Sequence, residues 1–215
     1  RHYSAVRSGD GAQFYEGAVR LLDPDGLSVI SDIDDTVKIS NVTDRKSLLE
    51  HTFLLDFVAA PGMAELYRDW ASDDVAFHFV SSSPWHLYKP LHEFLDSSGF
   101  PSATFSLKSV RFRDETLFDL FKKGTETKPA AIRKILDRYP DRRFVLVGDS
   151  GEQDPEVYAA LLRERPEQIA KVYIRNVTQE REDNERFKTE FEDIDPDRWQ
   201  LFEDPEHLGL ATAPL

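Results

Sequence analysis

The chain has 215 residues and a formal net charge of −13, with 27 lysine and arginine residues against 40 aspartate and glutamate residues. This length corresponds to one full domain with appendages, enough to bury about 70% of the unfolded surface. No cysteine is present, which excludes disulfides, cysteine-ligated metal sites and thiol nucleophiles. Because nucleic-acid binding depends on basic side chains that neutralise phosphates, the negative charge argues against nucleic acid as a partner.

The longest uninterrupted apolar segment runs only from Val157 to Leu162. A membrane-spanning helix needs roughly 18 such residues. We therefore expect no transmembrane helix or signal-type segment, a cytoplasmic location, and at most transient contact with a membrane surface.

Short apolar segments alternate with segments of helical periodicity, which predicts an α/β domain with a mainly parallel sheet. Residues 1–26 are expected to form an N-terminal strand extension, with a strand from Phe14 to Leu22. The core domain is expected over residues 27–205, and a tail over residues 206–215. The predicted core strands are Leu27 to Ser31, Val75 to Val80, Phe144 to Val147 and Val172 to Val177.

Three apolar stripes of helical spacing each follow a proline that suits the first turn of a helix. They are Met63 to Trp70 behind Pro61, Ile132 to Tyr139 behind Pro129, and Val157 to Leu162 behind Pro155. The dense charge from Thr178 to Asp197 favours a solvated helix and loop, after which Trp199 to Phe202 is expected to dock back as a short strand.

Three carboxylates, those of Asp32, Asp34 and Asp35, directly follow the first predicted core strand. Ligands of open α/β sheets bind at this edge, and like charges packed there need a hard cation such as Mg²⁺. The alternative is a helix cap or an acidic turn. An EF-hand calcium loop is excluded, because Val37 and Thr43 stand where it requires Gly and Glu.

A second acidic segment, residues 148–154, follows the third core strand. Gly148 permits close backbone approach, and Asp149 ends a strand from which it could meet Asp32 and Asp34. The alternative is a turn that caps the next helix. A serine hydrolase built on Ser150 is disfavoured, because Glu152 breaks its motifs and the α/β alternation disagrees with an all-β protease barrel.

Two further features complete a possible phosphoryl-transfer site. Ser81, Ser82 and Ser83 follow the second core strand, where hydroxyl and backbone N–H groups could hold phosphate oxygens. Lys128, at the predicted start of a helix, would supply a fixed positive charge against the transferred group. Each feature alone is also typical of a turn or of a solvated surface residue.

The order of these segments resembles that of the four motifs of the haloacid dehalogenase superfamily of phosphatases. The matching segments are Asp32-x-Asp34-x-Thr36, Ser81, Lys128-Pro129, and Gly148-Asp149 through Asp154.

Within this superfamily, the segments 31–38, 80–85 and 148–155 closely resemble the catalytic domain of the fungal actin-patch phosphatidate phosphatase family, which also has bacterial members. This similarity covers the chain from about Phe14 to Pro205. Lipins share the Asp-Ile-Asp core but usually have Gly where this chain has Asp35, which favours the first family. The resemblance implies a Rossmann-like three-layer sandwich with a minimal cap or none.

The resemblance also implies catalytic and metal-binding roles. Asp32 would attack phosphorus to give an aspartyl-phosphate, while Asp34 would protonate the leaving alcohol and then activate water. Mg²⁺ would be held by Asp32, the backbone carbonyl of Asp34 and Asp149, and Asp154 would support these ligands.

The implied substrate-binding residues are Thr36, Ser81, Ser82 and Lys128. Lys128 and one of the two serines would hold the phosphoryl oxygens, and the choice between Ser81 and Ser82 stays open. Thr36 would steady the loop of the first motif.

The resemblance implies a phosphomonoester substrate and favours phosphatidate or a related lipid phosphate. The locally basic segment from Lys108 to Lys128, interleaved with apolar residues, could receive an amphiphilic phosphate. An ordinary helix with a solvated charged face explains that segment equally well. A phosphatase of soluble phosphomonoesters and a catalytically silent metal-binding interaction module remain open alternatives.

Overall fold

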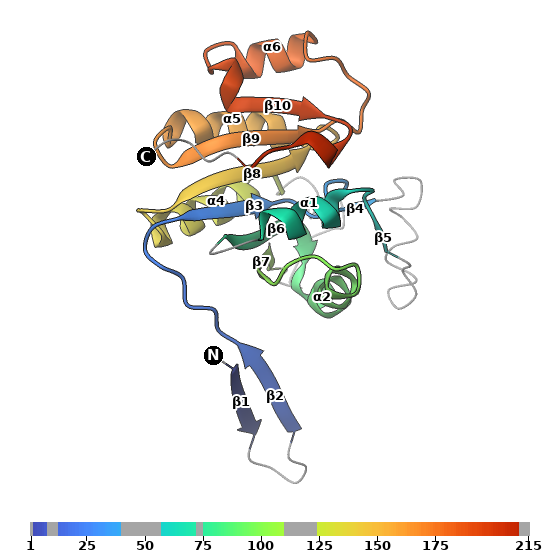
Figure 1. Ribbon diagram of the computed structural model, residues 1–215, viewed down its shortest axis with the longest axis vertical. Coiled ribbons are helices and arrows are strands. Elements are labelled where there is room, and N and C mark those ends of the chain that lie inside the picture. Colours follow the sequence, from blue (N-terminus) through green and yellow to red (C-terminus); the bar gives the residue numbers. More distant parts are fainter. Residues whose placement is uncertain (1, 8–12, 40–56, 72–74, 110–123, 211–215) are drawn as a thin grey trace, which may run out of the picture.

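The computed structural model describes residues 2–7, 13–39, 57–71, 75–109 and 124–210. Its centre is a six-stranded sheet of order β10-β9-β8-β3-β6-β7, in which every neighbouring pair is parallel (Figure 1). This confirms the predicted parallel α/β architecture. The strands are β3 (Leu27–Ser31), β6 (Ala76–Pro84), β7 (Ala103–Lys108), β8 (Arg143–Asp149), β9 (Ile169–Arg175) and β10 (Trp199–Phe202).

Helices cover both faces of this sheet, which gives the three layers of a Rossmann-like haloacid dehalogenase fold. Because side chains alternate along a strand, Val145 and Val147 of β8 join one buried apolar cluster and Phe144 and Leu146 join the other. The first cluster contains α1 (Met63–Trp70) and α2 (Tyr88–Ser97), and the second contains α4 (Gly124–Arg138), α5 (Asp154–Glu164) and α6 (Glu185–Phe191). The described residues also form the short 3₁₀ helices η3 (Trp85–Leu87), η4 (Pro196–Arg198) and η5 (Pro205–His207).

The strand order places the chain's switch of direction at β3. The chain goes from β3 to β6 and β7 on one side, and then to β8, β9 and β10 on the other. The carboxyl ends of β3 and β8 therefore lie side by side, and the backbone N–H of Asp32 donates to the carbonyl of Val147 at 2.9 Å. Ligands of doubly wound sheets bind at such a switch point.

Two small antiparallel sheets accompany the main one. The sheet of β1 (His2–Arg7) and β2 (Gln13–Ala18) lies apart from the body of the molecule in Figure 1. The strand predicted from Phe14 to Leu22 thus ends at Ala18, where its pairing with the unpredicted β1 ends. The proposed domain boundaries stay a prediction.

The second small sheet follows the first acidic motif. It pairs β4 (Lys38–Ile39) with β5 (Val58–Ala59). The segment 40–56 between these strands lies outside the described residues, so the expectation of a minimal cap or none stays a prediction there.

The prolines mark helix starts less faithfully than predicted. α1 begins after Gly62, whose φ of 74° is left-handed, so Pro61 precedes the helix. α4 begins at Gly124 and includes Pro129 in its interior, at the loss of one backbone hydrogen bond. Lys128 therefore lies inside the helix instead of at its start. Pro155 does stand in the first turn of α5.

The weakest strand predictions concern β7 and β9, whereas the edge strand β10 has the predicted bounds. β7 was not predicted, because its alternating small, polar and apolar residues lack the density of a buried strand. β9 begins at Ile169, three residues before the predicted start, and ends at Arg175.

The segment around α6 is not the fully solvated helix that its charge predicted. Phe187 and Phe191 are buried and stack on Trp199, with ring centroids 5.9 and 4.1 Å apart. Only one narrow side of this short helix is apolar. The sequence pattern is therefore dominated by charged residues and does not indicate the contact with Trp199.

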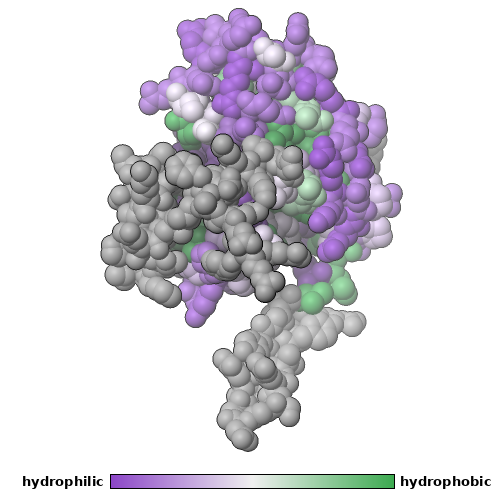
Figure 2. Space-filling view, turned by 180° about the vertical axis from the view of Figure 1, so that it is seen from behind, coloured by the Kyte–Doolittle hydropathy of each residue, from purple (hydrophilic) through white to green (hydrophobic). Residues whose placement is uncertain are grey.

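Figure 2 shows a largely hydrophilic face over the described residues. None of the helices within the described ranges is both long enough and apolar enough to cross a bilayer.

Candidate active site

Three buried carboxylates meet at the carboxyl edge of the sheet. Asp32 follows β3, Asp149 is the last residue of β8, and Asp154 is the first residue of α5. Their side chains are at most 1% exposed, and one oxygen from each lies within 4.8 Å of the others. The fold thus unites two predicted metal ligands with Asp154, which had been predicted to stand behind them.

Lys128 enters this carboxylate cluster from α4. Its Nζ lies 2.9 Å from Oδ1 of Asp32 and donates to Oδ1 of Asp154. Burial disfavours the ammonium, but the two carboxylates more than offset this and raise the pKa of Lys128 well above its usual value. Lys128 is therefore a fixed positive charge.

The cluster carries more negative charge than one lysine can balance. Burial, reinforced by Asp154, raises the pKa of Asp149 to about 8, and burial raises that of Asp32 well above its usual value. Oδ1 of Asp149 accepts from the N–H groups of Gly151 and Glu152 at 2.7 and 3.1 Å. Its Oδ2 is buried and has no hydrogen-bond partner among the described residues. An all-oxygen donor set with an unsatisfied carboxylate oxygen fits a hard divalent cation.

The side chain of Asp34 belongs to a separate contact group. Its Oδ1 lies 2.5 Å from Nζ of Lys38, and its Oδ2 accepts from the hydroxyls of Ser81 and Ser83 at 3.0 and 3.1 Å. Burial opposes ionisation, but Lys38 and the two serines together lower the pKa of Asp34. The carboxylate is consequently ionised at neutral pH.

Lys38 and Ser83 were not predicted as site residues. Ser83 could have been found from the sequence. Residues two apart in an extended segment share a face, so Ser83 is expected on the same face as the predicted site residue Ser81. Lys38 has a weaker signal, since its approach to Asp34 depends on the turn between them.

Ser81 and Lys128, both predicted to hold phosphate oxygens, line one small cavity of about 30 Å³ between β6, β7 and α4. The hydroxyl of Ser81 also accepts from the N–H of Ser83 at 2.9 Å. Ser82 lies between the two serines that contact Asp34. The roles of Ser81 and Ser82 as phosphate ligands stay predictions.

The first acidic loop is held from several sides. The hydroxyl of Thr36 donates to Oδ2 of Asp32 at 3.4 Å. Below it, the phenol of Tyr67 donates to Ser31 at 2.8 Å, and the Ser31 hydroxyl donates to the carbonyl of Asp32 at 2.6 Å. Burial raises the pKa of Tyr67, so this phenol keeps its proton. These contacts fix the position of the Asp32 carboxylate.

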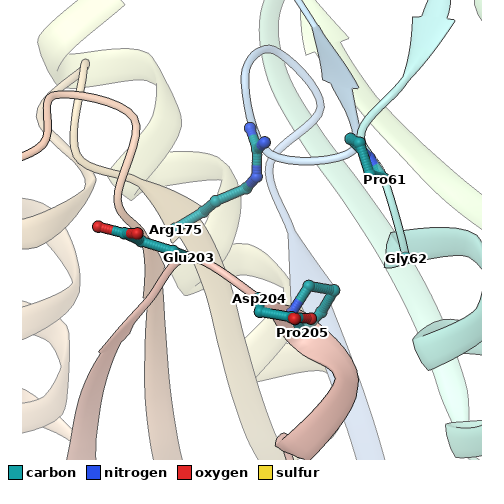
Figure 3. A pocket seen from close by; sticks show the side chains of 6 residues that line it. All are labelled: Pro61, Gly62, Arg175, Glu203, Asp204 and Pro205. Atoms are coloured by element: carbon teal, nitrogen blue, oxygen red, sulfur yellow. The ribbon is translucent and has the colours of Figure 1, made fainter.

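Asp35 adopts a left-handed conformation with φ of 55°. Its carbonyl accepts from Nη1 of Arg175 at 2.8 Å. Arg175 also lines a hollow of about 340 Å³, with Pro61 and Gly62 on the α1 side and Glu203, Asp204 and Pro205 on the β10 side. Figure 3 shows Arg175 reaching from β9 toward the loop that follows β3.

Arg186 of α6 holds the second acidic loop, residues 150–153, in place. Its guanidinium donates to the carbonyls of Ser150 and Glu152 and forms an ion pair with Glu156 at 2.7 Å. The Ser150 hydroxyl accepts from the N–H groups of Val177 and Thr178. Ser150 is thus engaged in holding the end of β9, which agrees with rejection of the serine-hydrolase interpretation.

Gly148 makes room for Asp154, which gives a testable expectation. A Cβ on Gly148 would lie 2.7 Å from Cβ and Cγ of Asp154, closer than packed atoms approach. We expect Gly148→Ala to displace Asp154 and to weaken cation affinity about 10- to 100-fold, as losses of supporting residues at metal sites do.

The measurement is the Mg²⁺ concentration that gives half-maximal thermal stabilisation. Gly209→Ala is the matched control, because its Cβ would meet no atom of the described residues within 4 Å. An unchanged midpoint in Gly148→Ala would show that Asp154 does not support the cation.

Part of the predicted substrate-binding segment cannot be placed. Lys108 ends β7 and Lys128 lies in α4, but residues 110–123 between them fall outside the described residues.

Comparison with known proteins identifies similar sequences. A family model described as the catalytic domain of the phosphatidate phosphatase APP1 matches residues 27–176. Phosphatidate phosphatase APP1 of Saccharomyces cerevisiae is 34% identical over 158 residues, covering 71% of this chain and 26% of that protein. An uncharacterized protein of Schizosaccharomyces pombe is 32% identical over 166 residues, covering 76% and 27% respectively. The chain thus spans about a quarter of the length of these curated relatives.

Proposed function

Because the chain belongs to the family of phosphatidate phosphatase APP1 catalytic domains, we propose that it hydrolyses phosphomonoesters through a phosphorylated Asp32. The observation that carries this proposal is the position of Asp32. It lies at the switch point of the sheet, 2.9 Å from the Lys128 ammonium and within the same buried group as Asp149 and Asp154.

In the first step, a carboxylate oxygen of Asp32 forms a bond to phosphorus while the bond from phosphorus to the ester oxygen breaks. Asp34 starts ionised, so the proton it delivers comes from the phosphate monoanion of the substrate. Asp34 takes that proton and passes it to the leaving oxygen, which departs as the alcohol. Lys128 would stabilise charge on the phosphoryl oxygens.

In the second step, water attacks the phosphorus of the aspartyl-phosphate and the bond to the Asp32 oxygen breaks. Asp34 accepts the proton of this water and returns it to the phosphate that leaves. Asp32 is thereby restored as a carboxylate, and no co-reactant other than water is consumed.

Asp32 and Asp149 would hold a divalent cation, for which we propose Mg²⁺, with Asp154 beside them. The predicted third ligand is the backbone carbonyl of Asp34. A cation bound there would neutralise charge shared by the carboxylates and the phosphoryl group.

The proposed substrate is phosphatidate or a related lipid phosphate monoester. Family membership supports this class, and the net charge of −13 argues for brief contact with an anionic lipid surface over stable adsorption. Soluble phosphomonoesters are the second candidate class, because the carboxylates and Lys128 address only the phosphoryl group.

The test is phosphate release from phosphatidate in detergent micelles and from a panel of soluble phosphomonoesters, each with Mg²⁺ and with EDTA. We expect release from micellar phosphatidate that falls to background in EDTA. A preference for a panel member would instead assign a soluble substrate. Absence of release from every substrate would refute the phosphatase and leave a metal-binding interaction module.

A further inference from the structure

Both oxygens of the Asp34 carboxylate are held, but by partners of different kinds. Oδ1 faces the Lys38 ammonium at 2.5 Å, and Oδ2 receives the hydroxyls of Ser81 and Ser83. The side chain of Lys38 is 9% exposed and that of Asp34 is 21% exposed, so water screens this ion pair only weakly.

Lys38 is itself held in place by its surroundings. Its backbone N–H donates to the carbonyl of Ile33 at 3.0 Å, and its carbonyl accepts from the N–H of Asp35 at 2.7 Å. β4 pairs it with Ala59, and its Nζ lies 4.9 Å from the centroid of the Phe57 ring. The turn that bears Asp34 therefore also fixes the base of the lysine that contacts it.

During the reaction, Ser81 is a less permanent hydrogen-bond partner of the Asp34 carboxylate than Lys38 is. The Ser81 hydroxyl has a single hydrogen, which it gives to Asp34, and a phosphoryl oxygen bound by Ser81 would compete for it. An ammonium has three hydrogens and a full charge, so Lys38 can keep its contact throughout the reaction. Lys128 cannot substitute for it, because its Nζ contacts Asp32 and Asp154.

We propose that Lys38 is the positioning residue that fixes the Asp34 carboxylate for proton transfer to the leaving group. This role rests on the proposed phosphatase function and adds to it a residue that was not predicted as part of the site. Lys38 exchanges no proton itself, since the proton passes between Asp34 and the ester oxygen.

The test compares two leaving groups. Alkyl phosphates need a proton on the departing oxygen, whereas p-nitrophenolate leaves as a stable anion. We expect Lys38→Met, which keeps an unbranched side chain beside Phe57, to slow the first step alone in a leaving-group-dependent way. The rate of formation of the phosphorylated enzyme, measured by rapid quench, should fall about 10²-fold with a short-chain phosphatidate and less than about threefold with p-nitrophenyl phosphate. Lys38→Arg is expected to recover much of the loss, because it keeps the charge and the donors.

A double variant separates positioning from general damage. If Lys38 acts through Asp34, Lys38→Met combined with Asp34→Asn is no slower on the alkyl substrate than Asp34→Asn alone. Lys171→Met is the matched control: its ammonium lies 5.4 Å from the Tyr173 ring on β9, and both rates should stay unchanged. Equal losses of Lys38→Met on both substrates, or additive losses in the double variant, would overturn the role.

A spectroscopic measurement makes this role testable without turnover. In protein labelled with ¹⁵N-lysine, a hydrogen-bonded Lys38 ammonium should exchange slowly and give a resonance that Asp34→Asn abolishes and Asp137→Asn leaves intact. A Lys38 signal unaffected by Asp34→Asn would overturn the contact itself. Failure of every phosphatase assay with an intact Lys38 signal would instead refute the proposed function.

Discussion

Replacement of Asp32 by asparagine is expected to reduce phosphate release at least about 10⁴-fold while the protein stays folded. A carboxylate is required to form the acyl phosphate, and loss of a catalytic nucleophile typically costs this much or more. The amide keeps nearly the same volume in this fully buried position, so it can occupy the space between Thr36 and Lys128.

The measurement is kcat for the preferred phosphomonoester, with circular dichroism and the unfolding midpoint as checks of folding. Asp137→Asn is the matched control, because Asp137 is exposed on α4, pairs with Arg165 and lies outside the carboxylate cluster. A well-folded Asp32→Asn that retains more than about a tenth of the wild-type rate would be incompatible with nucleophilic attack by Asp32.

Replacement of Asp149 by asparagine is expected to stabilise the metal-free protein and to remove its response to Mg²⁺. Burial raises the pKa of Asp149 to about 8 in the folded state, from a usual value of 3.8. The folded state therefore binds a proton that the unfolded state has released. Its stability falls as pH rises from about 4 to about 8, by up to about 5 kcal/mol from this group.

In EDTA at pH 8, the asparagine variant should consequently unfold at a higher denaturant concentration than wild type, and the difference should shrink toward pH 4. Addition of Mg²⁺ at 100 times its dissociation constant should stabilise wild type by about 2.7 kcal/mol. The variant should show almost none of this gain. Equal Mg²⁺ stabilisation of both proteins would place the cation away from Asp149.

The meeting of the Asp32 and Asp149 carboxylates at one edge of the sheet was predictable from the sequence. Asp32 and Asp149 each end an apolar strand, and the carboxyl ends of parallel strands share one edge, so their meeting follows from local pattern and topology. Asp154 was assigned a supporting place, yet its carboxylate lies among the group that could bind a cation. Gly148 explains this, because only a residue without a Cβ lets the start of α5 come so close.

Contacts that depend on tertiary geometry were not predictable in this way. Arg186 sits in a segment dense with charge, and nothing local distinguishes it from the exposed arginines around it. Its hydrogen bond to the carbonyl of Ser150 forms only when α6 packs onto the core through Phe187 and Phe191. Lys38 is similar, because its contact with Asp34 needs the turn that the positive φ of Asp35 allows.

The central claim, transfer of the phosphoryl group through an enzyme carboxylate, is tested most directly by the stereochemistry at phosphorus. A substrate whose phosphate is chiral through oxygen isotopes would be hydrolysed by wild-type protein with Mg²⁺, and the configuration of the released phosphate determined. Two successive in-line displacements, by Asp32 and then by water, predict overall retention of configuration. Inversion would show a single direct attack by water and would contradict the phosphorylated Asp32.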